Sequence, residues 1–124
     1  GWIKSNSVGF YGIDYSWKKG EHTQRGIFNP DFFIKYKNRI IVVEIKGDEQ
    51  ISNPEIENIA KYKAACEHFK FINQKLKKDK TDLRYKFTMI TPKSYEVFFN
   101  SFNSNNIEDI DGFISQLDAA IEVM

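Results

Sequence analysis

The sequence has little of several features that define common protein classes. Cys66 is the single cysteine among 124 residues, which excludes an internal disulfide framework and any metal site with several thiolate ligands. No apolar run approaches the roughly 20 residues of a membrane-spanning helix, and the first residues lack the basic-then-apolar pattern of a signal peptide. We therefore expect one cytoplasmic domain over residues 1–124, with no membrane contact. The start at Gly1-Trp2, without a methionine, leads us to expect a fragment of a larger protein.

Basic residues are missing from the last part of the chain. Residues 94–124 contain six acids and no lysine or arginine, a formal charge of −6, whereas residues 1–93 carry +7. A basic body attracts phosphate backbones through counterion release, and an acidic end repels them. The same distribution also fits ordinary solvated surfaces, so charge alone does not identify a partner.

The hydrophobic pattern predicts three strands before the first helix. Alternating apolar and polar residues predict a half-buried strand over about residues 10–18. Residues 27–34 and 39–47 flank a turn at Lys37-Asn38 and predict a β-hairpin. The second of these strands is apolar on both faces through Val43, which is typical of a central strand covered on both sides.

Helical patterns follow the hairpin. Ser52-Asn53-Pro54-Glu55 has the residue types of a helix start, and an apolar stripe predicts a helix to about Lys77. A strand over residues 85–90 then predicts a strand–helix–strand crossover with parallel pairing. Residues 94–102 and 107–121 predict two more helices. The expected fold is mixed α/β: an antiparallel meander plus a parallel strand after a crossover helix, flanked by helices.

The predicted hairpin brings two acids together. A turn at Lys37-Asn38 pairs Tyr36 with Arg39, and the same register places Asp31 opposite Glu44. Directly opposite side chains have β-carbons about 4.5–5.5 Å apart. Two unit charges about 5 Å apart repel by roughly 3 kcal/mol at an effective dielectric of about 20, so the pair needs a compensating charge. A divalent cation such as Mg²⁺, which prefers oxygen ligands, is the natural candidate.

Lys46 completes the constellation. It lies two residues beyond Glu44, so the strand period puts both side chains on one face. An ammonium group there can orient a water molecule or stabilise negative charge on a phosphorus, while a cation held by Asp31, Glu44 and the backbone carbonyl of Ile45 lowers the pKa of water. This set predicts a phosphodiester-hydrolysing site.

The residues also match a known pattern. Pro30-Asp31, followed after twelve residues by Glu44-Ile45-Lys46, resembles the PD-(D/E)XK nuclease superfamily. Residues 28–34, 42–47 and 61–65 together look like the endonuclease domain of type III restriction enzymes and related helicase-nucleases. The resemblance spans roughly residues 10–92, and Asp with a later Glu-x-Lys is a weak pattern without this context.

The resemblance implies a restriction-endonuclease-like sheet and a DNA endonuclease activity that requires Mg²⁺, with Mn²⁺ as a substitute. It assigns metal binding to Asp31 and Glu44 and the attacking water to Lys46. The implied partners are DNA, a helicase or translocase domain upstream in the same chain, and a modification subunit. Two departures stand out: few residues precede the first strand, where the family usually has a helix, and Asn58 with Tyr62 replaces the Gln-x-x-x-Tyr motif of some relatives.

The remaining candidates have structural interpretations of equal or greater weight. Lys61 and Lys63 are predicted phosphate contacts, although helix lysines are commonly just solvated. Tyr15 and Trp17 either stack on bases or pack in the core. Surface or core roles are favoured for the other candidates, namely Glu21, His22, His68 and Cys66.

Three functions follow from these residues. The favoured one is a metal-dependent DNA endonuclease module of a restriction or helicase-nuclease enzyme. The alternatives are a catalytically silent domain of the same fold, which binds nucleic acid or a helicase partner, and a nuclease acting on RNA.

Overall fold

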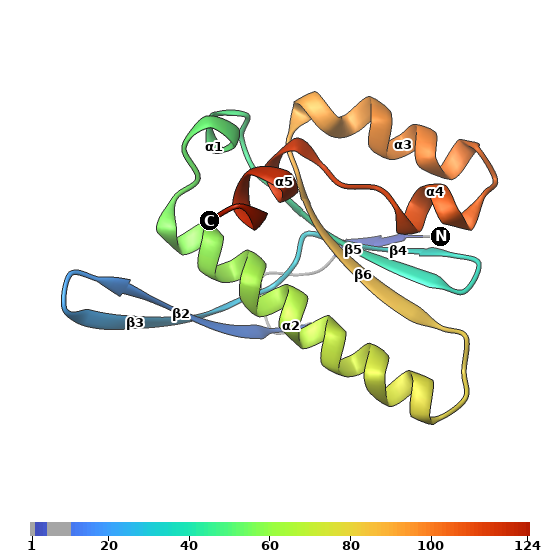
Figure 1. Ribbon diagram of the computed structural model, residues 1–124, viewed down its shortest axis with the longest axis horizontal. Coiled ribbons are helices and arrows are strands. Elements are labelled where there is room, and N and C mark those ends of the chain that lie inside the picture. Colours follow the sequence, from blue (N-terminus) through green and yellow to red (C-terminus); the bar gives the residue numbers. More distant parts are fainter. Residues whose placement is uncertain (1, 5–10) are drawn as a thin grey trace.

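The computed structural model describes residues 2–4 and 11–124 and shows a mixed α/β chain with two sheets (Figure 1). The larger sheet has the strand order β1-β4-β5-β6, comprising β1 (Trp2–Lys4), β4 (Phe32–Tyr36), β5 (Arg39–Ile45) and β6 (Arg84–Ile90). Strands β2 (Ile13–Lys19) and β3 (His22–Phe28) form a separate two-stranded ribbon. The helical elements are α1 (Glu49–Ser52), α2 (Ile56–Lys78), the 3-10 helix η1 (Pro92–Ser94), α3 (Tyr95–Asn103), α4 (Ile107–Asp111) and α5 (Gln116–Glu122).

The β4–β5 hairpin has the predicted register. Tyr36 pairs with Arg39 across a tight turn in which Lys37 has a left-handed φ of 52°. The pairing continues to Phe32 opposite Val43. Strand β6 then pairs parallel with β5 after the crossover through α2, as the strand–helix–strand pattern predicts.

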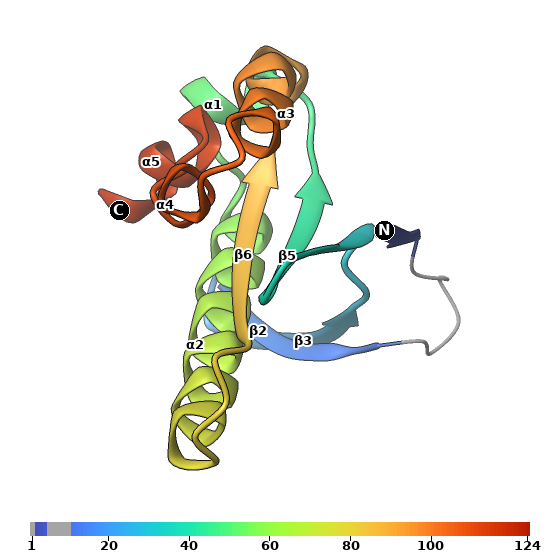
Figure 2. The same ribbon diagram turned by 90° about the vertical axis from the view of Figure 1, so that its right-hand side faces the viewer.

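Apolar layers cover both faces of the central strand. Val42 belongs to a core that includes Tyr62 and Phe69 of α2 and Leu117 of α5. Val43, on the opposite face, belongs to a second core that includes side chains of α3 and α4. Helix α2 runs along one side of β6, and α3 follows the carboxyl end of β6 (Figure 2). No helix within residues 2–4 and 11–124 is long and apolar enough to cross a membrane.

The ribbon corrects the predicted meander. The sequence pattern predicts no strand between the strands over 10–18 and 27–34, but His22–Phe28 form a strand that pairs antiparallel with β2. Strand β3 is exposed from His22 to Arg25, so it lacks the apolar alternation that marks a strand packed on a core. The ribbon does not join the larger sheet, and the predicted strand over 10–18 is observed from Ile13 to Lys19, with position 10 outside the described residues.

The helices differ from prediction mainly at their ends. The crossover helix begins at Ile56, and a short additional helix, α1, precedes it. The expected helix over 107–121 is broken into α4 and α5. Ser115 starts α5 with a capping box in which its side chain and that of Asp118 each bond the other's backbone N–H. This capping, together with burial of Phe113 in the preceding loop, explains the break.

Side chains cover part of the outer edge of β6. The Asn73 amide donates to the carbonyl of Tyr85 at 2.8 Å and accepts from its N–H at 2.8 Å. Farther along the strand, Asp118 accepts from the Met89 N–H at 2.8 Å, and the Ser115 hydroxyl donates to the Met89 carbonyl. These contacts satisfy backbone groups that an additional strand would otherwise pair with.

Candidate metal and catalytic site

The β4–β5 hairpin brings Asp31 and Glu44 together. Extending the observed register by one pair beyond Phe32 and Val43 places Asp31 opposite Glu44. The backbone N–H of Ile45 donates to Asp31 Oδ2 at 2.8 Å, which fixes the carboxylate at the end of β5. The predicted meeting of the two acids is therefore observed.

Glu44 is an acid in an environment that disfavours its charge. It is 6% exposed, and its Oε1 is buried without a hydrogen-bond partner among the described residues. Burial first, then the neighbouring Asp31 carboxylate, raises the pKa of Glu44 to about 7. The Lys46 ammonium lies 3.5 Å from Glu44 Oε2 and offsets part of this effect. The three predicted catalytic side chains thus converge at one place.

Lys61 extends the positive charge of this site from helix α2. Its Nζ lies 5.3 Å from the centre of the Tyr15 ring and 5.8 Å from that of Phe28, both on the ribbon. The Lys61 charge also acts to lower the pKa of Glu44, which places the ammonium on the side of the candidate site. Lys63 points elsewhere, because its Nζ donates to the carbonyl of Met124 at 3.2 Å. The structure therefore brings Lys61, but not Lys63, to the acids.

Tyr15 and Glu57 belong to the same neighbourhood; the sequence marks Tyr15 as a candidate for base stacking or core packing, whereas Glu57 was missed. The Tyr15 hydroxyl donates to Glu57 Oε1 at 2.7 Å, and burial together with the charges of Glu57 and Glu44 raises the pKa of Tyr15 to about 12. The Tyr15 ring lies against Gly26, where an added β-carbon would come within 2.7 Å of the hydroxyl oxygen. The sequence did contain one signal for Glu57: it precedes Lys61 by four residues, so the two side chains lie on the same face of the helix.

The residues present fit a divalent cation. Two carboxylates, one of them with a buried unpartnered oxygen, supply the hard oxygen ligands that Mg²⁺ prefers. Ile45 packs its side chain on the opposite face, as predicted, so only its backbone is available to this site. Among residues 2–4 and 11–124, no group of three or more His, Cys, Asp or Glu side chains could hold a metal. Any remaining ligands therefore have to come from backbone, water or substrate.

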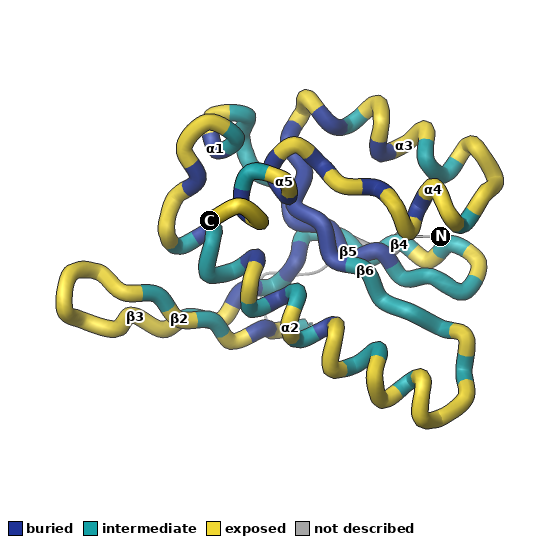
Figure 3. The backbone as a smooth tube through the Cα atoms, in the orientation of Figure 1, coloured by how far each residue is buried: buried dark blue, intermediate teal, exposed yellow. Residues whose placement is uncertain are grey.

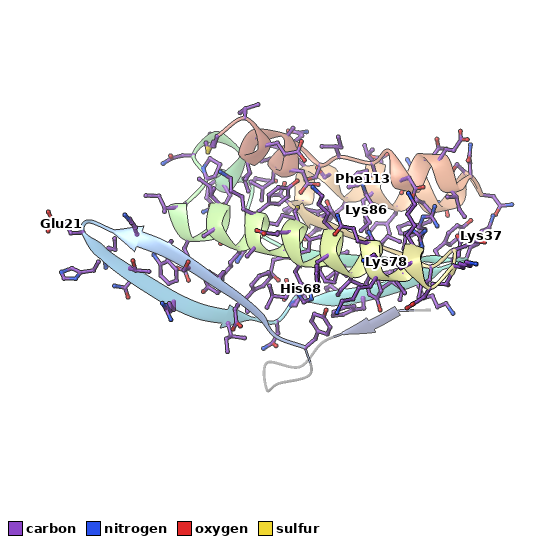
Figure 4. All side chains as sticks on the ribbon, turned by 60° about the horizontal axis from the view of Figure 1, so that its bottom comes forward. Glu21, Lys37, His68, Lys78, Lys86 and Phe113 are labelled. Atoms are coloured by element: carbon purple, nitrogen blue, oxygen red, sulfur yellow. The ribbon has the colours of Figure 1, made fainter. Side chains whose placement is uncertain are left out.

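The other candidates lie away from the acids or have structural partners. Glu21 is at the tip of the ribbon (Figure 4), where it does not act as a third acid. His68 forms a 2.5 Å hydrogen bond with Tyr11. Burial raises the pKa of the Cys66 thiol to about 11, which makes it a poor nucleophile at neutral pH. Asn58 is buried and donates to Gln50, so it serves the packing of α1 on α2.

Comparisons with known proteins do not identify a family or a function for this chain. No family model matches the chain, and no match is found among curated proteins or among solved structures.

Proposed function

We propose that this chain is a metal-dependent nuclease domain of the PD-(D/E)XK type that hydrolyses phosphodiester bonds in DNA. The observation that carries the proposal is the buried Glu44 carboxylate, held beside Asp31 and 3.5 Å from the Lys46 ammonium. A fold gains no stability from two neighbouring carboxylates, one of which has an unpartnered oxygen. Such an arrangement is typical of a site prepared for a cation.

Each residue has a defined role in this proposal. Asp31, Glu44 and the carbonyl of Ile45 would hold Mg²⁺, or Mn²⁺ in its place. The cation supplies Lewis-acid activation and lowers the pKa of water when it is bound. Lys46 orients the attacking water and stabilises the negative charge that grows on the phosphate as the water oxygen bonds to phosphorus and one ester P–O bond breaks. Lys61 supports the site from α2 by attracting the phosphate backbone.

The mixed sheet with flanking helices supports this assignment at a coarser level, because its central hairpin and crossover helix are the elements that the family uses. In this proposal the chain is one module of a larger protein, a restriction or helicase-nuclease enzyme. An upstream helicase or translocase domain and a modification subunit are its proposed partners, and they would supply target choice.

Cleavage of supercoiled plasmid DNA tests the activity. We expect nicking or linearisation with Mg²⁺ and loss of at least a hundredfold in rate with Asp31→Ala, Glu44→Gln or Lys46→Ala, since each removes a charge that acts in the transition state. Asp14→Asn is the matched control, because Asp14 is an exposed acid on the far face of the ribbon. Equal cleavage by all variants would point to a contaminating nuclease and reject the proposal.

A second candidate is a silent domain that binds nucleic acid without cleaving it. The Lys46–Glu44 ion pair favours it, since the ammonium compensates part of the carboxylate charge without any cation. Titration of Mg²⁺ monitored by thermal unfolding separates the two functions. The nuclease requires stabilisation of the wild type that is lost in Glu44→Gln, whereas a silent domain shows the same small response in both proteins.

A further inference from the structure

The β2–β3 ribbon extends beyond the rest of the molecule. At its base, Ile13 and Phe28 are buried in the core beside α2. Residues 18–25, which form the tip, are all exposed (Figure 3), and the tip carrying Glu21 projects past the end of α2 (Figure 4). An isolated two-stranded hairpin is only marginally stable in water. The exposed tip is therefore a segment available to a partner rather than a contribution to the core.

The register divides the ribbon into two chemically different faces. Side chains alternate between the faces, and directly paired residues share a face. One face, here called the site face, carries Tyr15, Trp17 and Lys19 with their partners Gly26, Gln24 and His22. The opposite face carries Asp14, Ser16 and Lys18 with their partners Ile27, Arg25 and Thr23.

The site face starts at the candidate catalytic site. Tyr15 lies near enough to Glu44 for the Glu44 charge to raise the pKa of the Tyr15 hydroxyl, and Lys61 lies over the Tyr15 ring. The Trp17 ring stacks on that of Tyr15, with centroids 5.3 Å apart and an interplanar angle of 13°. Lys19 follows four residues beyond Tyr15, about 14 Å farther out at a strand rise of about 3.4 Å per residue. This distance corresponds to about four base-pair steps of roughly 3.4 Å along a DNA strand.

The chemistry of the site face suits a nucleic acid. Lys19 offers a cation for phosphate, Gln24 offers an amide, and Trp17 offers a flat apolar ring next to the site. A two-stranded β-ribbon is one of the shapes that the major groove of B-DNA admits. We propose that the β2–β3 ribbon is a DNA-contacting arm, which holds the duplex through its site face about four base-pair steps beyond the point where Tyr15 meets the candidate site. This inference rests on the proposed nuclease function for its choice of partner.

Two neighbouring lysines provide the test. Lys18 and Lys19 carry the same charge at adjacent exposed positions, but they lie on opposite faces of the ribbon. The affinity of the chain for a fluorescein-labelled 20-base-pair duplex is measured by anisotropy in EDTA, which prevents cleavage, at 50 to 200 mM salt. We expect Lys19→Gln to weaken binding about eightfold at 0.1 M salt and to reduce the salt slope by about 0.9, the values for one lost phosphate contact.

The control variant Lys18→Gln should stay within about twofold of the wild type. Equal weakening by both variants, or no weakening by Lys19→Gln, overturns the proposal. Thermal unfolding of both variants verifies that the fold is retained, as expected for exposed tip residues. Because affinity is measured without a metal, the arm and the nuclease are tested separately. Face-specific binding without any plasmid cleavage would reject the nuclease alone, and cleavage without face-specific binding would reject the arm alone.

Tryptophan fluorescence gives an independent readout. The chain has two tryptophans, Trp2 and Trp17, and only Trp17 lies on the ribbon. We expect the duplex to change the emission of the wild type, and the change to disappear in Trp17→Phe. Persistence of the change in Trp17→Phe, with its loss in Trp2→Phe, would contradict contact through the site face.

Discussion

Glu44 combines two unfavourable features in a single side chain. Its side chain is buried near the end of the central strand β5, and the carboxylate of Asp31 lies beside it. Both features raise the free energy of its ionised form relative to water, and the Lys46 ammonium only partly offsets them. The metal-free protein is therefore less stable than its packing alone would allow.

We predict that Glu44→Gln stabilises the metal-free protein at pH 8. The folded pKa of about 7 lies above the ordinary value of 4.5, so the unfolded chain loses this proton first, and wild-type stability falls as pH rises through this interval. Above pH 7 the ionised Glu44 lowers the free energy of unfolding of the wild type by up to about 3 kcal/mol, at about 1.4 kcal/mol for each unit by which its pKa is raised. This effect is absent at pH 4, below both pKa values. Urea unfolding in EDTA at both pH values measures the difference.

The exposed acid Glu67 on α2 serves as the control for this prediction. Glu67→Gln should change the free energy of unfolding by less than about 0.5 kcal/mol at either pH. A Glu44→Gln variant that is less stable than the wild type at pH 8 would show that the carboxylate acts as a structural ion-pair partner of Lys46.

At the scale of elements, the edge strand β6 depends on helix α2 for more than apolar packing. The Asn73 side chain reproduces both hydrogen bonds that a neighbouring strand would make to Tyr85. Asp118 and Ser115 do the same for Met89 at the other end of β6. Side chains from two different helices thus take the place of a fifth strand.

We predict that Asn73→Leu lowers the free energy of unfolding by about 1–3 kcal/mol. It removes two hydrogen bonds and leaves the Tyr85 backbone groups unpaired at a partly buried edge. The adjacent, exposed Gln74 provides the control, and Gln74→Leu should change stability by less than about 0.5 kcal/mol. Urea unfolding checks both variants. Equal stability of the two would mean that water replaces the amide at this edge.

The sequence predicts elements well where local rules determine them. The short turn at Lys37-Asn38 fixes the register of β4 and β5, and with it the meeting of Asp31 and Glu44. Strand β3 is missed because its residues are mostly polar and exposed, so no apolar face indicates a strand. Its pairing follows instead from the turn at Gly20, whose φ of 66° suits glycine.

The site is predicted only in part for a related reason. Asp31, Glu44 and Lys46 lie on one hairpin, where strand periodicity places them. Tyr15 reaches the site because the ribbon crosses α2, and this tertiary contact has no local signal in the sequence.

At the scale of the whole molecule, the two cores share strand β5, and the ribbon takes part in only one of them. Ile41 and Val43 face one core, and Val42 faces the other. The acidic C-terminal segment is joined to the basic body by the bidentate pair of Arg39 with Asp111, at 2.8 and 3.0 Å. The molecule is therefore organised around β5, and the tip of the ribbon, residues 18–25, is exposed on both faces (Figure 3).

We predict that amide hydrogen exchange follows this organisation. Amides of β5 should exchange at the rate of global unfolding, because both faces of the strand are covered. Amides of residues 18–25 should exchange by local opening, at least a hundredfold faster, because their side chains are all exposed. Mass spectrometry of peptic peptides measures both segments. Protection of the ribbon equal to that of β5 would reveal self-association through the ribbon.

The connections of β5 also set the order in which the chain can assemble. Its pairing with β4 closes over a short turn, whereas its parallel pairing with β6 must first close a loop of residues 46–83. Loop-closure entropy makes the nearby pairing early and the distant one late. We therefore expect Asp31 and Glu44 to meet while water still surrounds them, and their repulsion to raise the free energy of the folding chain only when α2 packs against β5. The charge pair that is proposed to serve catalysis consequently opposes the last steps of folding and leaves the first ones unhindered.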